Sequence, residues 1–551
     1  MSQPLKLLPY LQNQLSELLL NIGKELLQHL RYFAKKLGGI KMKQKKILKA
    51  IIWMTLCCIA LASPINSYAY MGSMGYEGGV SAADSYEDGT YTYREICLLS
   101  GVPVILEGTL KVKKNARQGK TTTTYTYELY NNEQDASITR VIVMDNLLDE
   151  KEIGQTVETS KITKVPVEVV RINGVTYSLR KYEFTRSGIT DPQAAVNYNT
   201  GEYVIKKVYN INTGGTVSVE MSGRQYGYDQ YWSSAKSAAV NINIKYEPVL
   251  NGEAHAWDGF ARVSVSNVAK KSFKYVENEP WQISFEGGYV EQNWEESILE
   301  YDAYLPEFDK DGYATDVIRN FNELVGLNTE PVNSRLLVPD LKHLRGHWAE
   351  EPVKILYSLE VLSGTGEIFN PAEYITRRDF TAMLVKAIKD IPADPDLITR
   401  TSTTKTTSSR KKSVEISPFA DIGIEDPFYY EIKVASTRGI VQGTGQTYFK
   451  PDRHITTAEA ITMIIRAIGL EGLAAYPYSI TTFIDNDDIP AYARNSAEVA
   501  FRIGLVEGDG RGYLKPNDTL TYERASALIY RLIRYMGEEL VKDYCDRVLA
   551  Y

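Results

Sequence analysis

The sequence predicts a multidomain protein with an all-β N-terminal region, antiparallel and sandwich- or barrel-like, followed by a C-terminal all-α bundle of three repeats. Three observations favour this fold class. Short runs rich in β-branched and aromatic residues recur between about 90 and 290, separated by Gly and Asn turns. Three similar segments, each with an apolar stripe at helical spacing, follow near the C-terminus. The chain has 551 residues, which is too long for a single core.

The N-terminal segment is predicted to lie outside the mature fold. Residues 42–69 have the layout of a secretory signal: a basic cluster after Met42, an apolar run and small residues before a cleavage point after Ala69. The alternative is a retained membrane anchor, although the apolar run is shorter than the roughly 20 residues that a membrane span needs. Residues 1–41 are interpreted as a doubtful leader, either an extension of the gene model or a long n-region.

The charge of the mature chain limits its partners. Residues 1–69 hold 10 of the 62 basic and 2 of the 69 acidic residues, so the remainder carries a formal charge of −15. An acidic exported chain is a poor partner for nucleic acid and for an anionic wall, so wall binding requires specific sites. Two cysteines remain, Cys97 and Cys545, and the sequence leaves open whether they pair.

Residues 70–290 form the predicted β-rich domain or domains. Runs such as "ITRVIVMD" and "YVIKKVYNI" are typical of strands, and turns are expected at Asn173-Gly174 and Gly214-Gly215. Residues 291–337 are predicted to be a helical connector, because apolar and acidic positions are mixed there. The acidic residues of this connector, Glu291, Glu295, Glu296 and Glu300, indicate a solvated helix face; the alternative is a glycosidase carboxylate pair.

Three C-terminal segments share one pattern. They occupy residues 338–390, 418–470 and 480–537, with a Ser/Thr-rich linker at 391–417 and a tail at 538–551. Each has a Gly-x-Gly turn, an aromatic residue or Leu before Pro, and a Thr at the predicted helix N-cap, namely Thr376, Thr456 and Thr521. No unit can bury its apolar stripe alone, so we expect the three to share a core.

This triplet resembles the S-layer homology (SLH) family of bacterial cell-surface proteins. The resemblance implies a pseudo-threefold bundle that anchors an exported protein to the cell wall without a covalent bond. It also implies a partner, a secondary cell-wall polysaccharide often bearing a pyruvate ketal, with other surface-layer proteins as a further class of partner. The family signature Ile-Thr-Arg-Ala-Glu corresponds to "ITRRD", which places its Arg at Arg377.

Ligand-binding residues are carried over by their place in the motif. They are Asp340, Trp348, Gly364, Arg377, Asp421, Gly443, Asp485 and Gly508. Thr457 and Tyr522 replace the signature Arg in the other two repeats, so one complete groove is expected. Helix N-terminal amides beside a guanidinium would suit the ketal carboxylate. The alternatives are a surface ion pair of Arg377 with Glu373, capping or turn-forming roles for the three Asp residues, and packing for Trp348.

The sequence shows no complete catalytic or metal-binding motif, and no cofactor is expected. His255, His343, His347 and His454 form no HExxH or Cys/His arrangement. We therefore expect a non-enzymatic surface protein whose β region is structural or adhesive and whose repeats bind wall glycan. The alternative is a wall-anchored enzyme acting on polysaccharide.

Overall fold

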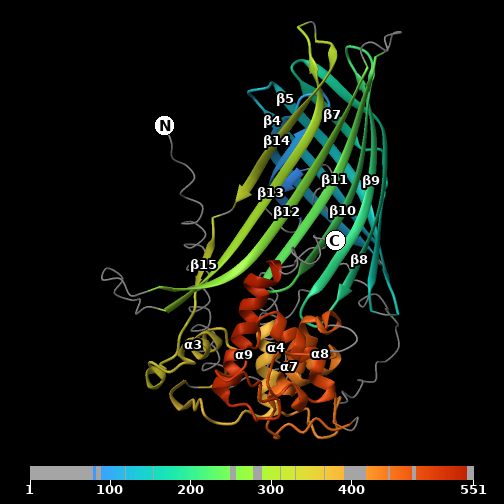
Figure 1. The fold of residues 1–551 in the computed structure, drawn as a ribbon. Coiled ribbons are helices and arrows are strands. Elements are labelled where there is room, and N and C mark those ends of the chain that lie inside the picture. Colours follow the sequence, from blue (N-terminus) through green and yellow to red (C-terminus); the bar gives the residue numbers. More distant parts are fainter. Residues whose placement is uncertain are drawn as a thin grey trace, which may run out of the picture. The chain divides into compact units, whose positions relative to one another are not determined.

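The fold comes from a computed structural model (Figure 1). It describes residues 79–81, 88–117, 120–152, 154–248, 256–276, 288–310, 312–328, 330–364, 366–389, 417–444, 447–474 and 480–542. The predicted leader and signal, Cys545 and nearly all of the predicted linker lie outside the described residues.

The described strands form one antiparallel sheet of 15 strands. Its order is β1 through β6, then β8 through β14, with β7 beside β5 and β8, and β15 beside β13. The strands are β1 (Gly79–Ser81), β2 (Gly89–Cys97), β3 (Val104–Arg117), β4 (Lys120–Asn131), β5 (Ala136–Glu150), β6 (Thr156–Ile162), β7 (Val167–Ile172), β8 (Val175–Pro192), β9 (Asn197–Ile211), β10 (Thr216–Asp229), β11 (Ser233–Glu247), β12 (Trp257–Val276), β13 (Gly288–Phe308), β14 (Ala314–Asn328) and β15 (Val332–Arg335).

Alternation of buried and exposed side chains along each strand explains the sheet. In β5, buried and more exposed residues follow one another from Ala136 onward, as expected when one face is turned to a core. The predicted turn at Asn173 and Gly174 is confirmed, with φ of 49° and 78°. Positive φ at both central residues is what a tight hairpin requires, and it joins β7 to β8 here.

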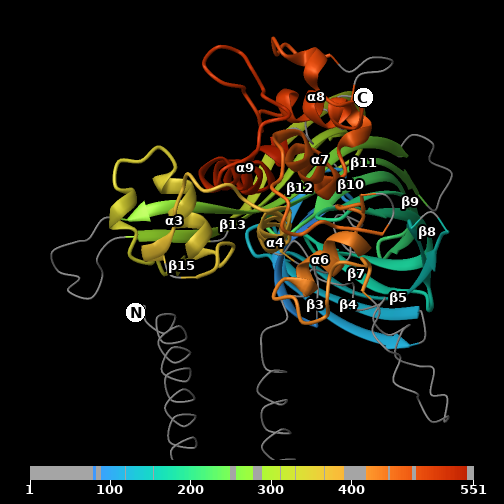
Figure 2. The same cartoon turned by 90° about the horizontal axis from the view of Figure 1, so that it is seen from below.

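The sheet curves and encloses its core, which differs from the sandwich that the sequence left open. Figure 2 shows the arc from β3 round to β12. Near the two ends of the strand order, Ser297 on β13 donates a hydrogen bond to the Ser81 carbonyl, and Arg94 on β2 donates to the Gly326 carbonyl. The buried cluster inside includes Leu106, Leu129 and Val263. One strongly curved sheet therefore encloses the apolar core, which in a sandwich would lie between two stacked sheets.

The predicted helical connector at 291–337 is wrong, because this segment forms most of β13 together with β14 and β15. Its apolar residues follow a period of two: Leu299, Tyr301, Ala303 and Leu305 are buried, and the acidic residues between them face outward. A mixed run of apolar and acidic residues is compatible with the period of a helix and with that of a strand. Pairing with β12 stabilises the strand here. The strand-rich region thus continues beyond residue 290 to Arg335.

The C-terminal region contains helices joined by turns and extended segments, at places where the sequence predicted helices. The described helices are η2 (Lys342–Leu344), α3 (Glu350–Ser358), η3 (Gly366–Ile368), α4 (Arg377–Ile388), α6 (Tyr429–Thr437), α7 (Thr457–Ile468), η4 (Glu471–Leu473), η5 (Asn486–Asp488), η6 (Ala491–Ala493), α8 (Arg494–Arg502), α9 (Tyr522–Arg534) and the π-helical η7 (Tyr535–Glu539). Thr376 and Thr456 cap α4 and α7 through their side chains, whereas Thr521 makes no side-chain cap bond to α9. The first residues of the predicted tail continue the helix to residue 542.

Two turns of the sheet bind carbonyl groups in α4, in α7 and just after α9. The Trp232 indole donates a hydrogen bond of 2.8 Å to the Ala387 carbonyl in α4. The Ala195 amide donates over 2.8 Å to the Ala467 carbonyl in α7. Ser233 donates over 2.6 Å to the Met536 carbonyl just after α9. Ala387 and Ala467 lie in the last turns of α4 and α7, where carbonyls lack intrahelical partners, so the sheet turns satisfy groups that burial would otherwise leave unbonded.

A buried ion network crosses the interior of the sheet. Arg140 on β5 donates two hydrogen bonds to Glu95 on β2, over 2.7 and 2.8 Å, and one of 2.8 Å to Glu168 on β7. The Lys207 ammonium and the Tyr209 hydroxyl on β9 also donate hydrogen bonds to Glu168, over 3.2 and 2.9 Å. Burial opposes ionisation, but the charges of Arg140 and Lys207 hold the pKa of Glu168 well below its usual range.

Trp232→Ala should destabilise the sheet and the helices together. The side chain is fully buried, contacts Phe273 and donates to α4. Removing it should cost about 3–5 kcal/mol of unfolding free energy. Trp294→Ala, at a site that is 39% exposed, should cost less than about 1 kcal/mol. Urea unfolding followed by circular dichroism measures both; separate sheet and helix transitions in the unaltered protein would contradict a shared core.

Lowering the pH should reduce the free energy of unfolding, partly through protonation of Glu168. Because its folded-state pKa is lowered, its contribution is present above the ordinary value of 4.5 and is lost as the pH falls below it. Glu168→Gln should cost about 3–5 kcal/mol at pH 7, since Arg140 and Lys207 lose their shared carboxylate. The same variant should show a shallower fall in stability below pH 4.5. Urea unfolding over this pH range tests it, with the exposed Glu183→Gln as the control.

Candidate functional site

The three C-terminal units meet in a closed ring of backbone hydrogen bonds. The Ile375 amide donates to the Leu520 carbonyl over 3.0 Å, and the Leu520 amide donates to the Ile455 carbonyl over 3.0 Å. The Ile455 amide then donates to the Ile375 carbonyl over 3.3 Å. Each of these residues directly precedes a Thr N-cap. The ring therefore places the N-termini of α4, α7 and α9 around one pseudo-threefold axis.

The first two amides of each of these helices are occupied by carbonyls of the next unit. This differs from the sequence expectation that helix N-terminal amides would be available to a ligand. The pairs are Arg377 with Arg453, Arg378 with Pro451, Thr457 with Asp518, Ala458 with Pro516, Tyr522 with Glu373, and Glu523 with Pro371. An anion at these junctions must therefore be held mainly by side chains.

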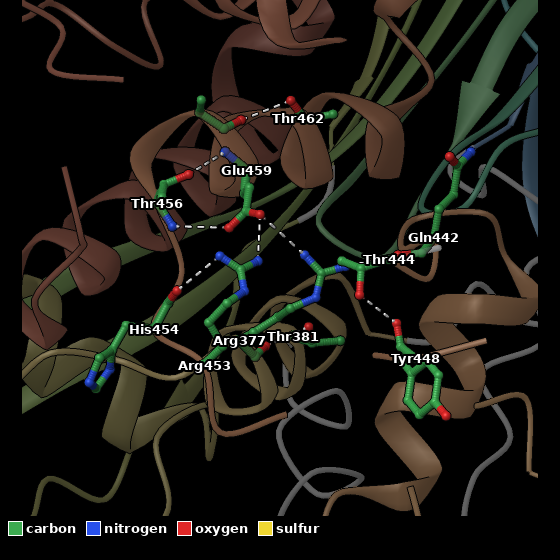
Figure 3. Close-up of polar contacts among 11 residues, drawn as sticks. Arg377, Thr381, Gln442, Thr444, Tyr448, Arg453, His454, Thr456, Glu459 and Thr462 are labelled. Atoms are coloured by element: carbon green, nitrogen blue, oxygen red, sulfur yellow. Dashed lines mark hydrogen bonds and ion pairs between the residues drawn. The ribbon is translucent and has the colours of Figure 1, made fainter. Parts of the chain in front are cut away.

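Arg377 lies between the first and second units (Figure 3). Its residue surface is 6% exposed, its guanidinium donates to the Gln442 carbonyl over 2.9 Å, and it lies 5.0 Å from the centre of the Phe449 ring. Its acidic neighbour is Glu459, at 3.9 Å, and not the Glu373 that the sequence suggested as an alternative partner. The side chain thus belongs to the junction rather than to the surface of its own helix.

Two guanidinium groups share one carboxylate at this junction. Arg453 contacts the same Glu459 oxygen as Arg377, at 2.5 Å, and Figure 3 shows the two arginines converging on it. The other Glu459 oxygen accepts the Thr456 amide of its own helix cap. The three charged groups carry a net charge of +1, and the buried Nε atoms of both arginines have no hydrogen-bond partner. Burial lowers the pKa of Arg377, because it separates the charged guanidinium from water.

The other two junctions use the same two positions with different residues. At each junction the first residue of one helix meets the third residue of the next. Thr457 lies 3.5 Å from Arg524, and the Tyr522 hydroxyl donates to Asp379 over 3.1 Å. Arg524, at the third position of α9, therefore supplies a guanidinium to a junction that lacks the signature Arg.

Two of the predicted Asp ligands hold loops within their own units. Asp421 accepts the amides of Phe449 and Lys450, over 2.7 and 2.6 Å. Asp485 accepts the amides of Leu514 and Lys515, over 2.9 and 2.7 Å. Both Lys450 and Lys515 have φ of 58°, a conformation that costs energy and that the paired amide bonds stabilise.

The third of these residues, Asp340, makes different contacts. It bonds the amide and the ammonium group of Lys342, two residues along the chain. These contacts are consistent with the turn-forming alternative.

The remaining predicted residues lie at the edges of the junctions. Trp348 is 59% exposed and packs against His347, which contacts Glu523 at the start of α9. Gly364 and Gly508 have φ of 98° and 80°, so the turns require glycine. Gly443 lies directly after Gln442, whose carbonyl accepts the Arg377 guanidinium.

A cavity of about 200 Å³ lies at the junction of the third and first units. Its lining includes Gly364, Phe369, Asp379, Lys386 and Tyr522. Phe369, Asp379 and Tyr522 occupy the positions that Phe449, Glu459 and Arg377 occupy one junction away. Lys386 donates to the Ser363 hydroxyl over 2.8 Å and supplies the cation here. Arg453 and Lys386 were missed by sequence reasoning, because neither belongs to the signature.

Part of the chain is similar to a known protein family and to several known proteins. The family model of the S-layer homology domain matches residues 340–381 and 418–461. An exoglucanase, XynX, of Acetivibrio thermocellus is 22% identical over 57% of this chain and 28% of its own length. The surface-layer 125 kDa protein of Lysinibacillus sphaericus is 24% identical over 38% of this chain and 16% of its own length. A surface layer protein of Brevibacillus choshinensis is 32% identical over 22% of this chain and 10% of its own length.

The chain spans less than a third of the length of each of these relatives. Residues 340–461 carry an S-layer homology domain with two matched repeats, and surface-layer proteins are among the relatives. Cell-wall anchoring is the role that this domain and these relatives support. Within the part of the chain that the structure describes, no helix is long and apolar enough to cross a membrane.

Asp421→Ala should destabilise the second unit more than Asp340→Ala destabilises the first. Removing Asp421 leaves two loop amides without their acceptor, which should cost about 1–3 kcal/mol. Asp340 bonds only its near neighbour, so its removal should change little. Thermal unfolding of both variants measures the difference, and equal effects would argue against the loop-holding role.

Proposed function

We propose that residues 338–537 anchor an exported protein to the cell wall by binding a secondary wall polysaccharide that bears a carboxylate, such as a pyruvate ketal. The observation that carries this proposal is the cluster of Arg377, Arg453 and Glu459, in which two cations share one acid. Residues 480–537 act as a third repeat of the same family, because they close the hydrogen-bonded ring with the two matched repeats.

The charge and burial of the cluster favour an organic anion. A net charge of +1 in a partly desolvated junction attracts a carboxylate more strongly than the same charge in water would. A guanidinium presents donors in a fork that fits two carboxylate oxygens. The partly exposed Arg453, with a side-chain exposure of 35%, provides the approach from solvent. Phe449 supports the Arg377 guanidinium from the other face.

The composition of the chain supports a specific site over general adhesion. The segment after residue 69 has a formal charge of −15, so an anionic wall repels it at long range. Binding then depends on short-range contacts at the junctions. We propose export through the signal at residues 42–69 and a final location on the cell wall, beside other surface-layer proteins.

We propose that the β region is a structural or adhesive module and not an enzyme. Its interior carboxylates at Glu95 and Glu168 are both bound by Arg140, which supports a role in holding strands together. The acidic residues at 296 and 300 lie on the outward face of β13. The alternative is a wall-anchored enzyme acting on polysaccharide, which the exoglucanase among the relatives favours, although the chain spans only 28% of its length.

Arg377→Ala should weaken wall binding at least about tenfold, because it removes one of the two cations of the cluster. The compact unit Ser67–Tyr551 would be sedimented with purified walls that retain their polysaccharide, with stripped walls, and with walls freed of ketal by mild acid. Arg453→Ala should have a similar effect, and Arg377→Lys should recover part of the binding.

Arg378→Ala is the matched control for this experiment. It removes an equal charge one residue along, where the guanidinium pairs with Asp426 and Asp452. Thermal unfolding of each variant separates lost binding from lost folding. Unchanged sedimentation of a folded Arg377→Ala variant would overturn the proposed site, and equal binding to ketal-free walls would overturn the proposed ligand.

A further inference from the structure

Strand β14 has an open edge. Among the strands that the structure describes, β14 is hydrogen-bonded to β13 alone. Near its end, the Arg94 guanidinium donates to the Gly326 carbonyl. The stretch before that contact, from Val317 to Val325, presents backbone groups along an edge to which no described strand pairs. Such an edge is a template for pairing with another chain.

Apolar side chains are exposed along this edge. Val317, Ile318 and Leu324 are 56%, 57% and 62% exposed. Successive residues of a strand point to opposite faces, so neighbours such as Val317 and Ile318 show that both faces of β14 are open here. Soluble proteins usually protect long edges with charge, bulges or a covering element. The central part of β14 carries exposed aliphatic residues on both faces, beside the charged Arg319 and Glu323.

We propose that β14 pairs with β14 of a second copy of this chain. The strands run antiparallel, with a twofold axis at Phe321. Paired residues then have numbers that sum to 642, so Phe321 faces Phe321 of the second copy. In an antiparallel pair, two directly opposite residues point to the same face of the sheet. This register meets that condition for each pair of residues.

Between Val317 and Val325, the register places residues of matching chemistry opposite one another. Arg319 lies opposite Glu323, and the twofold axis generates this ion pair twice. Ile318 lies opposite Leu324, Val317 opposite Val325, and Asn320 opposite Asn322. Opposite charges and apolar pairs placed across from one another stabilise antiparallel strands. The Arg319 guanidinium already lies 5.2 Å from the centre of the Phe321 ring, so its charge is next to the proposed axis.

Neighbouring registers lose this match. An axis at Asn320 would place Val317 opposite Glu323 and Ile318 opposite Asn322. An axis at Asn322 would place Arg319 opposite Val325 and Phe321 opposite Glu323. Both registers place apolar residues opposite polar or charged ones. The pairing with the axis at Phe321 is therefore favoured.

This pairing goes beyond the proposed anchoring role and does not depend on the ligand. A twofold contact uses the same surface on both copies, so it closes as a dimer and does not grow into a fibre. Each dimer would carry two wall-binding regions. Two linked binding regions hold a surface more tightly than one, provided that both can reach it.

Charge reversal tests the register. Arg319→Glu in the unit Ser67–Tyr551 places Glu opposite Glu twice and should raise the dimer dissociation constant about tenfold or more. Glu323→Arg should do the same, with thermal unfolding as a check because Glu323 accepts a hydrogen bond from the buried Tyr301 hydroxyl. The exposed Arg224→Glu on β10, which loses an ion pair with Glu202, is the matched control and should leave the dimer intact.

Rescue makes the test specific. The double variant with Arg319→Glu and Glu323→Arg should dimerise again, and the two single variants should form a mixed dimer when combined. Analytical ultracentrifugation over a range of concentrations measures each case. A protein that stays monomeric, a dimer that ignores Arg319→Glu, or an open-ended series of larger species would each overturn the proposal.

Discussion

The closed ring of three backbone hydrogen bonds at Ile375, Ile455 and Leu520 is the constraint on which the C-terminal region depends. Each bond joins two units, so no unit can be removed without opening the ring. The ring fixes where the three helices start, and the helix amides next to it are then satisfied by loops of the neighbouring unit. With the first two amides of each helix bonded, the side chains at the first and third helix positions differ from one junction to the next.

Those differences turn one repeated framework into three unlike junctions. The first pairs Arg377 with Glu459, the second Thr457 with Arg524, and the third Tyr522 with Asp379. The first also gains Arg453 and a surplus positive charge. The interior of the sheet shows the opposite arrangement, because Arg140 and Lys207 there are matched by two carboxylates. Balanced charges hold strands together, and unbalanced charge is found at the proposed binding site.

The sequence predicted what is local and repeated, and missed what depends on partners far along the chain. The Thr caps, the apolar helix stripes and the strand-rich half follow from short-range patterns, and the structure confirms them. Residues 291–337 were misjudged because their mixed pattern becomes a strand only through pairing along β12. Arg453 could not be found from the signature, because it precedes the helix and reaches the cluster through folding. The helix amides were expected to face a ligand, and only the cyclic arrangement shows which carbonyls occupy them.

The hydrogen bonds from sheet turns to helix ends also have a mechanical consequence. Trp232, Ala195 and Ser233 connect the sheet to three different helices. A pulling force on a wall-bound protein would therefore be divided among three attachments that must fail together. Bonds loaded in parallel resist tension better than bonds broken one after another. A display module attached in this way would transmit drag and shear from its surroundings directly to the wall.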